Sequence, residues 1–173
     1  MIIPEFEIGK EKESAFASVE RYLQSKQFPI TSSALNKPWG GYYVIEENDA
    51  HRFVRYFFPD DEKALLGTGK LSPKILVVAP GKRLSWQYHH RRSEIWKLIA
   101  GEAGVITSDT DEEEDQKKIK IGEVIRLSVG ERHRLVGLSG SWGAVVEIWQ
   151  HTDPKKPSDE NDIVRLQDDF NRA

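Results

Sequence analysis

The chain has 173 residues, with 25 Lys and Arg against 28 Asp and Glu and a formal net charge of −3. This length suits one domain with a buried core, and the nearly balanced charge argues against a nucleic-acid partner, which requires a strongly basic face. The chain has no cysteine, which excludes disulfides and thiolate ligands and fits a cytoplasmic location, and it shows neither a signal-peptide pattern nor an apolar run that suggests a membrane partner.

The first thirty residues are expected to form a helical arm, followed by the main domain over residues 31–173. Within residues 10–27, Phe16, Val19, Tyr22 and Leu23 recur at helical spacing. Such a stripe either covers the main domain or makes a dimer contact, and the first interpretation is favoured.

The next segments combine strand-like sequence with one long connection. Residues 42–45, 52–58 and 74–79 are rich in β-branched, aromatic or aliphatic residues and predict strands. Residues 60–73 contain glycines and a proline and predict a loop, which serves either as a lid over a site or as a plain surface insertion.

Residues 80–101 carry the densest group of candidate ligands. In a strand, Gln87, His89 and Arg91 would share one face, and a turn at residues 92–93 would place Glu94 and Trp96 on the inner side of the next strand. Imidazole, carboxylate and amide groups are suitable ligands for a divalent ion. This stretch therefore predicts half of a metal site.

The remainder of the chain predicts further short strands. They cover residues 103–108, 118–121, 122–127, 133–136 and 142–150, with a solvated acidic turn at residues 109–115 and a short closing helix within residues 162–171. The pattern is typical of an all-β barrel or sandwich of the jelly-roll type.

Four segments of the chain resemble a known family in the same order. PGKRLSWQYHHRRSEIWKLIAGEAGVIT resembles the first cupin motif of type II phosphomannose isomerases and of the C-terminal domains of bifunctional mannose-1-phosphate guanylyltransferases. GEVIRLSVGERH is similar to the second cupin motif, and KPWGGYYVIEE and DENDIVRLQDDFNR are similar to the segments that flank the domain.

The resemblance implies a cupin double-stranded β-helix with an internal divalent metal ion, expected to be zinc. The implied reaction interconverts mannose 6-phosphate and fructose 6-phosphate, so the expected partner is a sugar or sugar phosphate. The implied metal ligands are Gln87, His89, Glu94 and His133. Cupins often pair through barrel edges, so a homodimer is also expected.

An aldose–ketose isomerase moves a proton between C1 and C2, which requires a positioned base and stabilisation of the developing charge. Glu147 is the candidate base, and Lys74 and Arg165 are candidates for contacts with hydroxyls or phosphate. Trp96 is a candidate sugar contact, although tryptophans of this kind more often fill the core or an interface.

Arg91 stands where the family has a second histidine. It predicts either a weakened metal site or a contact with an anionic substrate. Two alternatives therefore stay open: an isomerase or epimerase of a free sugar, and a sugar-binding cupin without chemistry.

Overall fold

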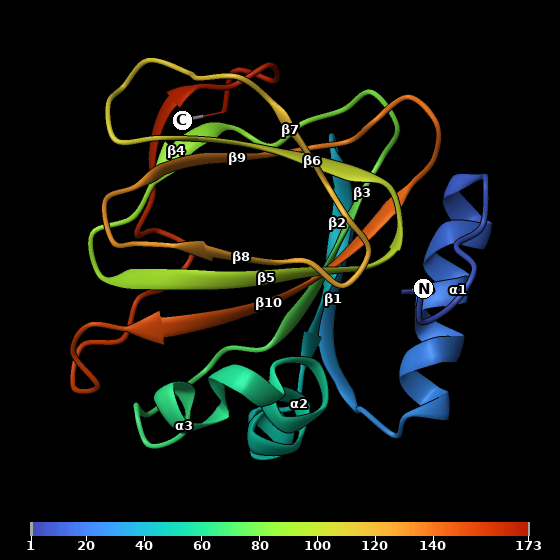
Figure 1. Ribbon diagram of the computed structural model, residues 1–173, viewed down its shortest axis with the longest axis horizontal. Helices are drawn as coiled ribbons and strands as arrows, with labels where there is room; N and C mark the ends of the chain where they lie inside the picture. The colour runs from blue at the N-terminus through green and yellow to red at the C-terminus, as the bar shows by residue number, and fades with distance from the viewer. Residues whose placement is uncertain (1, 173) are drawn as a thin grey trace.

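Two antiparallel sheets form the body of the molecule in the computed structural model, which describes residues 2–172 (Figure 1). The first sheet has the strand order β1-β2-β3-β10-β5-β8, and the second has the order β11-β4-β9-β6-β7. The strands of the first sheet are β1 (Ile30–Lys37), β2 (Gly40–Ile45), β3 (Lys74–Val78), β10 (Gly143–His151), β5 (Arg92–Gly101) and β8 (Val124–Leu127). Those of the second are β11 (Val164–Gln167), β4 (Trp86–Tyr88), β9 (Arg132–Val136), β6 (Ala103–Ser108) and β7 (Lys117–Ile119). The all-β prediction is confirmed.

Helices cover the outer face of the six-stranded sheet (Figure 1). They are α1 (Lys12–Ser25), α2 (Ala50–Phe57) and α3 (Glu62–Leu65), with 3-10 turns at Glu47–Asp49 and Pro59–Asp61. Among the described residues, no helix is long and apolar enough to cross a membrane. The leading helix is confirmed; the domain boundary at residue 30 stays a prediction.

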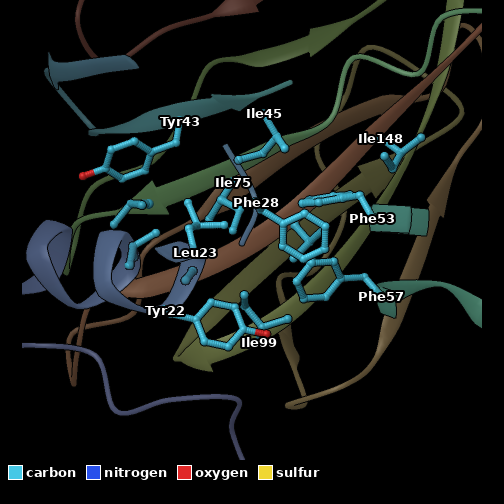
Figure 2. Packing of buried hydrophobic residues seen from close by; sticks show 14 of the residues in the cluster. Tyr22, Leu23, Phe28, Tyr43, Ile45, Phe53, Phe57, Ile75, Ile99 and Ile148 are labelled. Atoms are coloured by element: carbon cyan, nitrogen blue, oxygen red, sulfur yellow. The ribbon is translucent and has the colours of Figure 1, made fainter. Parts of the chain in front are cut away.

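An apolar cluster joins these helices to the sheet (Figure 2). Leu23 of α1 and Phe53 and Phe57 of α2 lie against Ile75 and Ile148, and all of these side chains are almost fully buried. Alternate residues along each strand point to opposite faces. The outer face of the sheet therefore packs against the helices, and the inner face lines the barrel.

Two secondary-structure predictions are wrong. Residues 52–58 form part of helix α2 and not a strand, because Ala50, Phe53, Val54 and Phe57 follow helical spacing and bury one face. The expected closing helix is strand β11, which pairs with β4 through Val164 and Tyr88. In addition, the loop expected over residues 60–73 begins with α3.

The acidic turn at residues 109–115 is bound to the second sheet by salt bridges. Asp111 lies 2.7 Å from Arg132, and Glu113 lies 2.5 Å from Arg134, whose side chain is fully buried. The Trp86 indole also donates to the carbonyl of Asp111 at 2.7 Å. Two of its carboxylates are thus neutralised by strand β9, and the turn is only partly the solvated loop that the sequence predicts.

Candidate metal centre

Three ligand side chains meet between the two sheets. His89 follows the end of β4, Glu94 lies in β5 and His133 lies in β9. Each residue offers one ligand atom, and these atoms all lie within 4.8 Å of one another. All three side chains are about 2% exposed. The structure thus brings together three of the four residues that the family resemblance implies as metal ligands, and their binding of a metal ion stays a prediction.

Backbone carbonyls fix the orientation of both imidazoles. His89 Nδ1 lies 2.6 Å from the carbonyl oxygen of Asp162, and His133 Nδ1 lies 2.9 Å from that of Glu131. A carbonyl can only accept a hydrogen bond, so both Nδ1 atoms must carry the proton. Each Nε2 atom is left to face the carboxylate of Glu94, at 3.1 Å from His89 and 3.5 Å from His133.

This arrangement requires a cation. A neutral imidazole with its proton on Nδ1 presents a lone pair at Nε2, and a carboxylate presents further lone pairs, so the two groups repel unless a proton or a metal ion lies between them. Glu94 Oε2 and His133 Nε2 have no hydrogen-bond partner among the described residues although both are buried. The residues present therefore fit a divalent metal ion.

The charges around Glu94 act on its protonation. Burial alone would raise the pKa of Glu94, but the nearby imidazoles of His89 and His133 and the charge of Arg92 hold it well below its ordinary value. For His133 burial acts in the opposite sense and would lower the pKa, yet the nearby carboxylate of Glu94 raises it overall. Glu94 is thus kept as an anion, the form that binds a metal.

Gln87 lies beside the centre without pointing its oxygen into it. Its Oε1 accepts a hydrogen bond from Ser85 at 2.6 Å, while its Nε2 lies 3.4 Å from His89 Nε2. Gln87 pairs with His133 in the β4–β9 ladder, which sets its position. Its role as a fourth ligand stays a prediction.

Glu147 lies on the inner face of β10 and is held by two indoles. Its Oε2 accepts from Trp96 Nε1 at 2.9 Å, and its Oε1 accepts from Trp149 Nε1 at 2.9 Å. Burial, reinforced by repulsion from Glu94, raises the pKa of Glu147 to about 7. Such a group exchanges a proton readily near neutral pH.

Arg91 lies outside the group of ligands, and its neighbour Arg92 lies inside it. The Arg91 side chain is 40% exposed and forms ion pairs with Asp159 and Asp162, so the prediction that it lies among the ligands is wrong. Arg92 is 5% exposed and lies inside, with its Nε 2.8 Å from Glu94 Oε1. Strand β4 ends at Tyr88, so the strand alternation assumed for residues 87–91 stops there.

A cavity of about 100 Å³ adjoins the centre. Gln87, Glu94, Trp96 and Glu147 contribute to its wall, together with Lys74 and Arg165. Lys74 forms an ion pair with Glu160, and its Nζ lies 4.1 Å from the centroid of the Trp149 ring. Six of the residues singled out from the sequence thus lie in this wall, whereas Arg91 does not.

Asp162, which was not singled out from the sequence, holds the turn that carries His89. Its carboxylate accepts from the backbone N–H groups of His90 and Arg91, each at 3.0 Å, and from Ser158 Oγ at 2.6 Å. Together with the hydrogen bond that His89 Nδ1 donates to the Asp162 carbonyl, these contacts tie the C-terminal loop to the turn that carries the ligand. Its position in the family-like segment DENDIVRLQDDFNR was the available signal.

Comparison with known proteins places this geometry in context. The family model described as the mannose-6-phosphate isomerase C-terminal domain matches residues 62–168. Mannose-1-phosphate guanylyltransferase of Escherichia coli K12 is 26% identical over 137 residues, which is 79% of this chain and 23% of that protein. The protein of the same name from Salmonella montevideo is 23% identical over 87% of this chain and 26% of its own length. The chain thus spans about a quarter of the length of these relatives.

Solved structures share the fold. The capsular polysaccharide assembling protein CapF of Staphylococcus aureus aligns with a TM-score of 0.54 at 14% identity, covering 90% of this chain and 40% of that one. Oxalate decarboxylase of Bacillus subtilis aligns with a TM-score of 0.55 at 18% identity, covering 79% of this chain and 30% of that one. The predicted cupin barrel is confirmed.

Proposed function

Because the chain belongs to the family of the mannose-6-phosphate isomerase C-terminal domain, we propose that it is a metal-dependent aldose–ketose isomerase of a sugar phosphate. The proposed reaction converts mannose 6-phosphate to fructose 6-phosphate. The observation that carries the proposal is the placing of Glu147, whose pKa is about 7, on the wall of the cavity that adjoins His89, Glu94 and His133.

The proposed ion is zinc, held by His89, Glu94 and His133 with Gln87 as a further ligand; when bound, it supplies a Lewis acid for the sugar oxygens at C1 and C2. With His89, Glu94 and His133 alone, a coordination position would stay free for substrate, as in catalytic zinc sites; with Gln87 as a fourth ligand, the substrate would take a fifth position.

Glu147 is the proposed base. Starting from the aldose, its carboxylate removes the proton from C2, and the same carboxyl returns a proton to C1 as the hydroxyl proton at O2 moves to O1, so the reaction consumes no other reactant. The indole N–H groups of Trp96 and Trp149 hold both carboxylate oxygens and fix the direction of proton transfer. A base with a pKa near the working pH is present in its active form and can still give the proton back.

Lys74 and Arg165 are the proposed contacts for the sugar hydroxyls and the phosphate. Both line the cavity, as do the cations Lys37 and Arg172. Arginine suits phosphate because its planar fork donates two parallel hydrogen bonds to an oxyanion. Trp96 lines the same cavity, which supports its proposed sugar contact.

The test is conversion of mannose 6-phosphate by zinc-loaded protein, measured as fructose 6-phosphate formed. Glu147→Gln and His133→Ala are expected to lower the rate by a factor of about 100 or more, since each removes a group that acts in the proton transfer or holds the ion. Glu112→Gln, on the exposed acidic turn, is the matched control and is expected to keep the full rate. Zinc-loaded parent protein that forms no ketose from any sugar phosphate would refute the proposal.

A sugar-binding cupin without chemistry is the second candidate. It is favoured by the contacts of Arg92, which engages ligand atoms of both His89 and Glu94. This candidate gives saturable binding of a sugar or sugar phosphate with no isomerised product. An isomerase or epimerase of a free sugar would instead turn over mannose and tolerate Arg165→Ala. A cytoplasmic homodimer stays a prediction, which gel filtration and fractionation of cells can test.

A further inference from the structure

The guanidinium of Arg92 contacts two of the atoms that would bind the metal ion. Its Nε donates to Glu94 Oε1 at 2.8 Å, and its Nη2 lies 3.3 Å from His89 Nε2. An imidazole Nε2 has a single lone pair, whereas each carboxylate oxygen has two. His89 therefore cannot accept a hydrogen bond from Arg92 and bind a metal ion through Nε2 at the same time, but Glu94 can do both.

Arg92 is also held firmly from its other side. Its Nη1 donates to Ser158 Oγ at 2.9 Å and to the carbonyl of Asp159 at 3.0 Å. The centre of the guanidinium lies 3.5 Å from the centroid of the Trp149 ring, within range of a cation–π interaction. The positive charge is thus fixed beside the ligands, and an arginine cannot relieve it by losing a proton.

We propose that Arg92 is an internal cation that competes with the metal ion for His89 and sets the affinity of the centre. The inference rests on the metal centre of the proposed function. Without Arg92, the ligand set of two neutral imidazoles and one carboxylate carries a charge of about −1; the guanidinium reduces it to about zero. A divalent ion must therefore overcome a like charge and break the contact between Nη2 and His89.

The competition also has a consequence for the cavity. Arg92 lines the cavity wall together with Glu94. When the ion takes His89 Nε2, the Nη2 group is released and becomes a donor at that wall. Loading the metal thereby provides a hydrogen-bond donor for an oxygen of the ligand in the cavity, and this donor is engaged until the ion binds.

The test is the zinc affinity of the full chain, measured by competition with a chromophoric chelator for the parent and three variants. Arg92→Met removes the charge and keeps an unbranched side chain against Trp149; Arg92→Gln removes the charge and keeps a donor for Ser158. Both are expected to bind zinc at least about tenfold more tightly than the parent, because each removes a like charge and frees His89 Nε2. The matched control is Arg91→Met, which removes the same charge from the neighbouring exposed position and is expected to stay within about twofold.

Thermal unfolding of each variant shows which of them are folded, and the two neutral variants at position 92 serve as replicates of one another. Zinc affinity that is equal to or weaker than the parent in the folded position-92 variants would overturn the proposal, because Arg92 would then support the ligands and not oppose the ion. Zinc binding by none of the proteins would overturn the metal centre itself and with it the proposed function. Zinc binding that tightens as expected without any isomerisation would support Arg92 as the competitor and refute only the isomerase.

Discussion

Replacing the buried carboxylate of β10 by an amide, Glu147→Gln, is expected to change how stability depends on pH in metal-free protein. Burial raises the pKa of Glu147 from its ordinary 4.5 to about 7. A raised carboxyl pKa means that the folded state prefers the protonated form, so its stabilising contribution is complete below about pH 4.5 and is lost as the pH rises through 7. One pKa unit corresponds to about 1.4 kcal/mol, so the loss amounts to about 3 kcal/mol.

The assay is urea unfolding of the parent and of Glu147→Gln in the presence of a chelator, at several values between about pH 4 and pH 8. The quantity of interest is the difference in unfolding free energy between the two proteins, in which contributions from titrating groups that do not interact with Glu147 cancel. The variant is expected to gain about 3 kcal/mol relative to the parent across this range. The amide leaves one indole N–H of Trp96 or Trp149 without an acceptor, but that penalty does not depend on pH.

Parallel pH profiles for the parent and Glu147→Gln would refute the reasoning, since Glu147 would then titrate alike in the folded and unfolded states. Glu112→Gln, on the exposed acidic turn, is the control and is expected to give a profile parallel to that of the parent.

Two further outcomes are expected. Zinc at about 100 times its dissociation constant should stabilise the parent by about 2.7 kcal/mol. Thermal unfolding should show no such gain for His133→Ala, which lacks one of the three converging ligands. An equal gain in both proteins would mean that zinc binds elsewhere. Phe53→Ala should cost about 3–5 kcal/mol in urea unfolding, because this ring is fully buried between α2 and the sheet. Tyr56→Ala, at a position on the same helix that is 41% exposed, should cost less.

Much of the site could be predicted from the sequence because its residues lie in segments with a regular period. Alternation along β5 places Glu94 and Trp96 on one face, and both line the cavity. The family-like second motif placed His133 in a strand that pairs with the Gln87 segment. At these positions the family-like motif and the strand alternation indicate the same orientation of the side chains, so the grouping of the ligands could be predicted.

The positions of Arg91 and Arg92 could not be predicted in this way. The phase of the strand is broken at His89–Arg91 because the carboxylate of Asp162 caps the backbone N–H groups of His90 and Arg91. Asp162 is about seventy positions away in the sequence, so no local sequence pattern predicts the turn.

The helix α2 was missed for a different reason. Its sequence is rich in aromatic and β-branched residues, which favour strands when the composition is judged alone. The spacing of Ala50, Phe53, Val54 and Phe57 carries the helical signal, and packing of that face against the sheet decides the outcome. Strand β11 was likewise missed because its partner, β4, is distant in the sequence.

The helices on the outer face of the six-stranded sheet determine how far the chain can be shortened. Helices α1 and α2 both end before residue 62, where the match to the family model begins. A fragment trimmed to residues 62–168 would bare the apolar face that Leu23, Phe53 and Phe57 now cover, and such a face invites aggregation. Helices α1 and α2 therefore shield an apolar face of the barrel sheet. Because this face is already covered, a tag, fused domain or engineered partner has to be attached at the sheet edges or the loops.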